Sequence, residues 1–142
     1  MIVLNDLSDT DYRIFIKYSV KTCDYFSLTF EKSDNIYINY DYYALMQDYV
    51  IRTENIVNHP DTGTEFTNAD KVDIKCCKFT CDLLLKPSCF SDFNGFLFPE
   101  ELCFYRNDTL WFRCISHEKL FIIENCNKYD KEYLLNHKII NQ

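Results

Sequence analysis

Two early segments alternate apolar with polar or aromatic positions, a pattern typical of half-buried strands. In the range 24–31, Phe26, Leu28 and Phe30 occupy every second position, which predicts a strand with one face toward a core. The range 35–40 alternates in the same way, and we expect it to be the hairpin partner of the first strand.

The period then changes from about 2 to about 3.6 residues, the repeat of a helix. One helical face is predicted, with Asp41 as its N-cap, from Tyr42, Leu45, Met46 and Tyr49. Before the first strand, the range 9–17 mixes polar and apolar residues and suits either a short helix or a strand.

The middle of the chain is punctuated by turn residues. The range 59–63 reads His-Pro-Asp-Thr-Gly, a turn signal, and the range 71–80 alternates again and predicts a strand. Pro87 excludes one continuous helix over the following segment, but it could open a short helix that ends at Asn94 and Gly95.

The last third contains the clearest hairpin. The ranges 102–106 and 110–115 are rich in strand-forming residues, and 107–109 is a short polar turn. A strand over 120–124 and a terminal helix over 128–139 complete the pattern. The buried side of the hairpin should include Phe104, Phe112 and Cys114.

These elements predict a single α+β domain over residues 1–142. Its sheet should be mixed but mostly antiparallel, with two to four flanking helices. The composition agrees, because 47% of the residues are hydrophobic and they include 12 Phe and 11 Tyr, enough bulk for one core.

Composition also narrows the chemistry. The two glycines are too few for the loops that bind phosphates or dinucleotides, so we expect no such cofactor. The eight cysteines include no Cys-x-x-Cys pair, which favours buried thiols over a metal site. A zinc site from Cys77, Cys81, Cys89 and one distant ligand stays as the weaker alternative.

The start of the chain has neither the basic region nor the apolar run of a signal peptide, and no stretch is long enough to span a membrane. We therefore expect a cytoplasmic protein with reduced thiols. The formal net charge of −7 repels nucleic acid and suits a basic protein partner, although such a charge also simply favours solubility.

Ser116, His117 and Glu118 form the most conspicuous polar cluster. A histidine beside a carboxylate could act as a general base. A zinc-protease helix would need a second histidine where Phe121 stands, and adjacent residues of a strand point to opposite faces. A structural turn or a partner contact is therefore the preferred interpretation.

Aromatic residues offer a second set of candidates. Tyr40 and Tyr43 lie off the predicted helical stripe in an acidic segment, where they could pack in the core or contact a partner. Trp111 lies on the face of its strand opposite the plainly apolar side, so it belongs either to a second packed face or to an interaction surface.

The segment PEELCFYRNDTLWFRCISHEKLFII, residues 99–123, resembles a family of small bacterial proteins of unestablished role. Its members share a Pro-Glu-(Asp/Glu)-Leu-Cys-Phe-Tyr-Arg stretch, a Trp strand and a Ser-His-Glu-Lys box, and some carry a sporulation-protein name. The likeness extends to the turn at 62–66 and the strand at 72–80. This chain departs from the family at Asp61 and Thr62, where the family has Trp-Pro, and its segment between Thr80 and Phe96 is shorter. Such families resemble immunity proteins, the cytoplasmic inhibitors of bacterial toxins.

The resemblance and the charge together predict a non-catalytic binding protein, an immunity-type inhibitor of a basic toxin domain, with no metal or cofactor and an oligomeric state left open. The alternatives are a small hydrolase or nuclease that uses His117 and Glu118, and a structural or regulatory module with no toxin partner. The expected contact residues are Tyr40, Tyr43, Glu54, Asp61, Glu65, Glu100, Glu101, Trp111, His117 and Glu118.

Overall fold

The computed structural model describes residues 1–141. In chain order they are β1 (Ile2–Leu4), α1 (Asp9–Thr22), β2 (Tyr25–Ser33), β3 (Ile36–Tyr37), α2 (Tyr40–Met46), β4 (Val50–Asn58), β5 (Glu65–Lys75), α3 (Lys78–Leu84), β6 (Glu100–Arg106), β7 (Thr109–Ile115), β8 (Leu120–Ile123) and α4 (Lys128–Asn136). Three short 3₁₀ helices are η1 (Gln47–Tyr49), η2 (Phe90–Asp92) and η3 (Ser116–Glu118).

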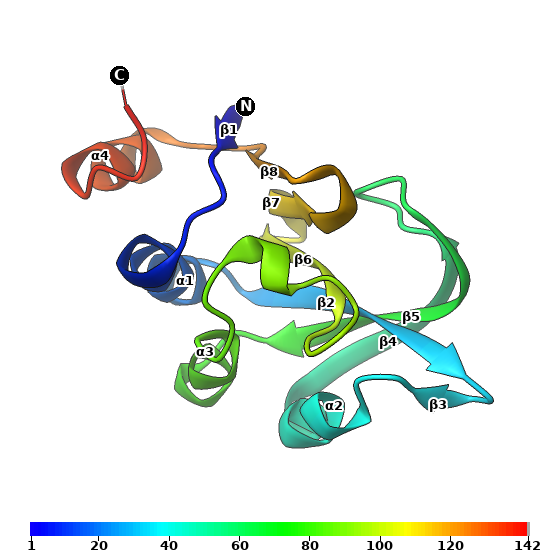
Figure 1. Cartoon of the computed structure of the whole chain (residues 1–142). Helices are drawn as coiled ribbons and strands as arrows, with labels where there is room; N and C mark the ends of the chain where they lie inside the picture. Colours follow the sequence, from blue (N-terminus) through cyan, green and yellow to red (C-terminus); the bar gives the residue numbers. More distant parts are fainter. Residues whose placement is uncertain (142) are drawn as a thin grey trace.

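The sheet has eight strands in the order β1-β8-β7-β6-β2-β5-β4, with β3 paired to β2, and every pairing is antiparallel. Figure 1 shows α1, α3 and α4 gathered along one side of the sheet, and both chain ends beside α4 and β1. The α+β class, the antiparallel sheet and the flanking helices are confirmed.

The core fills the space between α1 and the central strands. Phe104, Phe112 and Cys114 are fully buried, as the hairpin pattern predicts. The ring of Phe15 on α1 packs 4.9 Å from that of Phe112, and Phe26 packs beside Phe104 on the neighbouring strand. Burying rings of this size is the main favourable contribution of such a core.

Trp111 belongs to this core, which corrects the surface position expected for it. The β6–β7 register shifts between the pair Phe104–Phe112 and the pair Tyr105–Leu110, so Trp111 is the extra residue of a bulge. A bulge re-aims the side chain it carries. The indole therefore stacks on Phe15 at 5.7 Å and is 1% exposed.

Several predicted boundaries were wrong. The strand expected over 71–80 ends at Lys75. The Thr80 hydroxyl accepts a hydrogen bond from the backbone N–H of Cys77, the N-cap of α3, so the helix begins at Lys78. The N-cap of α2 is Asn39 rather than Asp41, and α2 ends before Tyr49. After Pro87 only the 3₁₀ turn η2 forms. Strands β1 and β4 were not predicted at all.

The second face of the sheet is polar and covered. Ser27 pairs with Cys103 on one side and Asp73 on the other, and all three are buried. The turn between β4 and β5 covers this face, because Asp61 accepts hydrogen bonds from the Tyr105 hydroxyl and, through its carbonyl, from Arg113. Figure 1 shows the far ends of β4 and β5 curling around that side.

His59 stabilises the turn that makes this cover. Its Nδ1 accepts the backbone N–H groups of Asp61 and Thr62. Burial lowers the pKa of His59 to about 4, so the ring is neutral at pH 7 and its proton is on Nε2.

All eight cysteines are free thiols in this structure. None of the helices among residues 1–141 is both long and apolar enough to cross a bilayer.

Candidate functional site

His117 lies between two carboxylates from different elements. From η3, its Nδ1 lies 3.7 Å from Oε1 of Glu101 on β6, and its Nε2 lies 3.9 Å from Oε1 of Glu118. Both distances are longer than a hydrogen bond. The sequence paired His117 with Glu118, and the structure adds Glu101 as a second neighbour.

Glu101 is fully buried, which corrects the exposed position expected for it. Between Ser27 and Thr29 the β2–β6 register slips, and Glu101 is the extra residue of this bulge. Its backbone has a φ of 59°, a left-handed conformation that non-glycine residues rarely adopt. The carboxylate is thereby turned into the covered face beneath His117.

Within residues 1–141, neither carboxylate oxygen of Glu101 has a hydrogen-bond partner of acceptable geometry. Burial raises its pKa, although the hydroxyls of Thr62 and Thr64, His117 and the amide of Ser116 act in the opposite direction. The Thr62 hydroxyl donates to Thr64 rather than to the carboxylate. Glu101 therefore has no hydrogen bond of acceptable geometry, although the Thr64 hydroxyl and the Ser116 amide lie close enough to favour its ionised form.

The neighbouring Glu100 is half-buried against Gly95. Its Cγ and Cδ lie 3.3 Å from the position of a Cβ at Gly95, whose φ is 90°, so a side chain there would displace the glutamate. Burial first, and then repulsion from Glu31 and Glu101, raise the pKa of Glu100 to about 8. In the free protein at pH 7 this carboxyl is mostly neutral.

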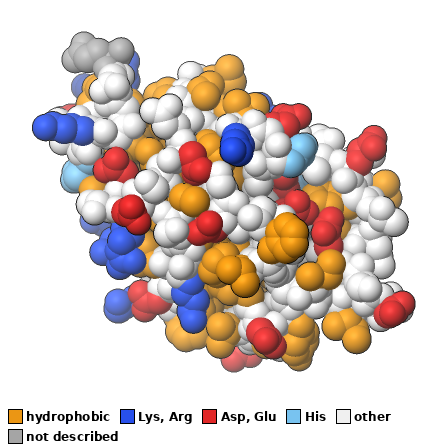
Figure 2. Space-filling view, in the orientation of Figure 1, with side chains coloured by type: hydrophobic (Ala, Val, Ile, Leu, Met, Phe, Trp, Pro, Cys, Tyr) orange, Lys and Arg blue, Asp and Glu red, His pale blue; other side chains and the backbone are white. Residues whose placement is uncertain are grey.

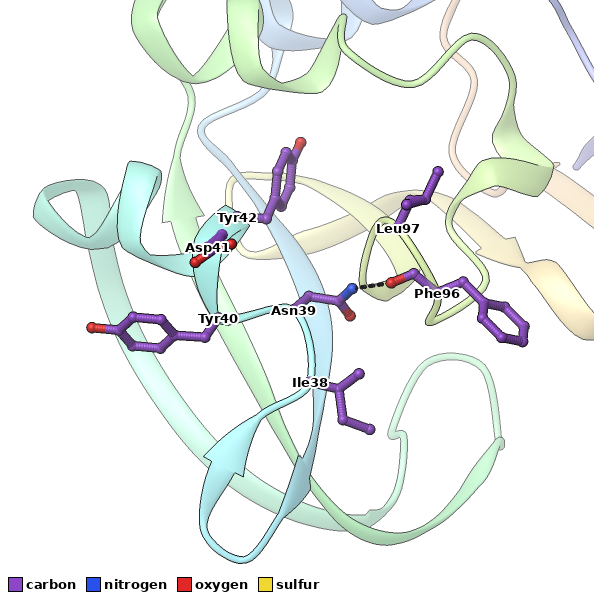
Figure 3. A pocket seen from close by; sticks show the side chains of 7 residues that line it. All are labelled: Ile38, Asn39, Tyr40, Asp41, Tyr42, Phe96 and Leu97. Atoms are coloured by element: carbon purple, nitrogen blue, oxygen red, sulfur yellow. Dashed lines mark hydrogen bonds between the residues drawn. The ribbon is translucent and has the colours of Figure 1, made fainter.

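Beside Glu100, the loop that connects η2 to β6 forms a shallow hollow with the start of α2. The hollow has a volume of about 260 Å³ and is lined by Ile38, Asn39, Tyr40, Asp41, Tyr42, Phe96 and Leu97. The Asn39 amide donates a 2.5 Å hydrogen bond to the Phe96 carbonyl and joins the two segments. Figure 3 shows the Tyr40 and Phe96 rings pointing outward on opposite sides of this bridge.

Four large apolar side chains on this hollow face the solvent. The exposed fractions are 83% for Phe96, 82% for Leu97, 54% for Ile38 and 53% for Tyr40. We call these four residues the Phe96 surface. Figure 2 shows apolar side chains gathered on this face of the molecule, with acidic side chains among them.

The loop from Asn94 to Phe98 joins the Phe96 surface to the group formed by His117, Glu101 and Glu118, which we call the histidine cluster. Gly95 contacts Glu100, and the Ser116 hydroxyl donates to the carbonyl of Phe93 immediately before the loop. The two features are therefore parts of one continuous region.

The other expected contact residues divide into two groups. Glu54 and Glu65 are exposed on β4 and β5, at a distance along the sheet from the loop. Tyr43 is half-buried and packs on Phe30 and Tyr37, and Asp61 is engaged within the molecule by Tyr105. Of the aromatic candidates, Tyr40 alone lies on the Phe96 surface.

Phe96 and Leu97 were missed by the sequence reasoning. The signal was present, because an apolar run at 96–98 stands between Asn94-Gly95 and Pro99. Flanking turn residues indicate a loop, and a loop that carries an apolar run cannot easily bury it.

The arrangement around His117 offers little for catalysis. Glu101 is too far from Nδ1 to orient the ring by a hydrogen bond, and the hydroxyl of the adjacent Ser116 is buried and already donates to the carbonyl of Phe93. Among residues 1–141, no three His, Cys, Asp or Glu side chains are grouped to hold a metal ion. Comparison of the chain with known protein families, curated proteins and solved structures finds no match in any of the three.

Proposed function

We propose that this chain is a non-catalytic binding protein whose partner covers the Phe96 surface. The observation that carries the proposal is the exposure of two consecutive large apolar residues, Phe96 and Leu97, at more than four-fifths each. Single exposed apolar residues are common, but contiguous ones around a hollow are typical of an interaction site. Aromatic side chains are favoured as energetic centres of interfaces.

The charge around the Phe96 surface favours a basic partner. Asp41 lines the hollow itself, and Glu31 and Glu100 lie next to it without a Lys or Arg ion pair among the described residues. Together with the net charge of −7, the carboxylates of Asp41 and Glu31 would steer a cationic protein toward this face. An immunity-type inhibitor of a basic toxin domain fits this chemistry and the family resemblance of residues 99–123.

The test is binding to the products of the genes that adjoin its own, each measured by surface kinetics with the full chain. We expect one basic product to bind, and Phe96→Ala to weaken the complex by about 2 kcal/mol, as hot-spot residues do. Tyr129→Ala is the matched control, because Tyr129 is 76% exposed but lies on α4, far from α2 in Figure 1. Higher ionic strength should slow association, since charges are screened over about 8 Å at physiological salt.

Equal losses for Phe96→Ala and Tyr129→Ala would contradict the proposed surface. The enzyme alternative rests on the position of His117 between two carboxylates, and it makes a separate prediction. If it holds, His117→Ala abolishes a hydrolytic activity while the melting temperature is unchanged.

A further inference from the structure

We infer that Glu101 is the site that binds an arginine side chain of the partner protein, and that His117 is the movable cover of this site. The inference rests on the proposed function, since it names the chemical group of the partner. It concerns the histidine cluster, however, and not the Phe96 surface, so the two can fail separately.

The carboxylate of Glu101 has unmet hydrogen-bonding capacity. A carboxylate accepts up to about four hydrogen bonds, and buried polar groups in native proteins nearly always have partners. Glu101 has none of acceptable geometry among the described residues, although it is completely buried. Its left-handed backbone adds local strain, and strain of this kind clusters at functional sites.

The geometry of the Glu101 carboxylate suits a forked donor better than a single charged point. Neither oxygen of Glu101 has a partner of acceptable geometry, so both can accept a hydrogen bond once His117 moves aside. A guanidinium offers two parallel N–H donors that match this edge, whereas a lysine ammonium is a point charge without a fixed fork. The titratable groups that face the site are His117 and Glu118 from η3 and Glu100 from β6, and the carboxylate of Glu118 adds to the attraction of a cation.

His117 is the side chain whose movement would open Glu101 to a ligand. His117 is about half exposed, and its ring nitrogens are 3.7 and 3.9 Å from the two carboxylates. The imidazole can therefore rotate away without breaking a hydrogen bond to either of them. The turn that carries Thr62 and Thr64 lies on the other side of Glu101, so His117 is the neighbour of this carboxylate that faces the solvent.

Glu101 is connected to the Phe96 surface through its neighbour Glu100. Glu100 joins Glu101 to Gly95 and hence to the loop of Phe96. A partner large enough to cover both the Phe96 surface and His117 would bury its arginine next to an apolar anchor, where a charged pair is most effective as a hot spot.

The test uses the full chain with carbon-13 in its glutamate carboxyls, titrated with L-argininamide and, separately, with the uncharged isostere L-citrullinamide. We expect argininamide to shift the Glu101 carboxyl resonance toward that of the ionised form in a saturable way, and citrullinamide to leave it in place. Glu101→Gln should lower the affinity for argininamide by about tenfold, the effect of losing a charged bidentate pair. Glu132→Gln is the matched control on exposed α4.

His117→Ala provides an independent variant and should raise the affinity, because it removes the cover. Equal shifts by the two amides, or a Glu101→Gln protein that binds argininamide as the parent does, would overturn the inference. A lower affinity of His117→Ala would do the same, since it would make His117 a ligand contact. If Phe96→Ala still weakens the complex with the partner in that case, the proposed function survives without this site.

Discussion

Two buried carboxylates, Asp130 and Glu101, differ in how far the fold satisfies their hydrogen-bonding capacity. Asp130 on α4 accepts hydrogen bonds from the Tyr18 hydroxyl, the Arg106 guanidinium and the Trp111 indole. It also accepts the backbone N–H of Asn127. Glu101 accepts none of acceptable geometry among the described residues.

This difference distinguishes a carboxylate that stabilises the fold, Asp130, from one that we propose for recognition, Glu101. Burial opposes the ionisation of Asp130, but its donors outweigh that cost together and lower the pKa, so the charge ties α4 to α1, β6 and β7. At Glu101 burial prevails and the pKa is raised. The donors around Asp130 keep it ionised within the fold, whereas Glu101 can still accept donors from a partner, as we propose above.

The largest expected effect comes from breaking the satisfied site. Asp130→Ala should lower the free energy of unfolding by about 3–5 kcal/mol, because the largely buried Arg106 guanidinium loses its carboxylate and keeps only its hydrogen bonds to Thr22. Chemical denaturation measures this loss. Glu132→Ala, an exposed change on the same helix, should stay within about 0.5 kcal/mol. A loss at Asp130 no greater than that of the control would show that the network contributes nothing to stability.

The second effect has the opposite sign. Glu101→Gln should raise the free energy of unfolding by about 1–3 kcal/mol near pH 8, since it replaces a buried carboxylate that lacks hydrogen-bond partners with a neutral amide, which costs less to bury. The gain should shrink as the pH falls, because a neutral carboxyl resembles the amide. Thermal unfolding of both chains at pH 5 and pH 8 tests this, and a destabilised Glu101→Gln at both values would mean that the carboxylate is satisfied within the fold.

How far the sequence predicts these regions depends on the kind of signal. The strand phase of Phe104 and Phe112 was readable because alternation and a polar turn act over neighbouring residues. The bulges at Glu101 and Trp111 were not, because one extra residue changes the partner of every later position without changing the local pattern. Both misplaced contact residues lie at these bulges.

Strand β4 illustrates a second limit. Its residues from Ile51 to Asn55 are all exposed, because β4 is an edge strand that pairs only with β5. An edge with both faces in solvent carries no apolar alternation, so periodicity cannot reveal it. The donors of Asp130 were likewise invisible, since Tyr18 lies 112 residues away in the chain.

The smallest expected effect is a pH dependence at Glu100, which lies between the two regimes because it is only half-buried. Its pKa is raised to about 8 by burial and by Glu31 and Glu101, against about 4.3 in an unfolded chain. Below the lower value both states are protonated and the favourable contribution is complete. As the pH rises, the unfolded chain releases its proton first, so stability falls until the folded carboxyl also ionises near pH 8. Partial exposure to solvent reduces the size of this loss.

Glu100→Gln should therefore flatten the decline of the urea midpoint between pH 5 and pH 8 relative to the parent chain. The difference between the two chains cancels the contribution of His59, which is the same in both. Parallel pH profiles would show that Glu100 ionises at its ordinary pKa and that solvent, rather than Gly95 and Glu31, surrounds its carboxyl.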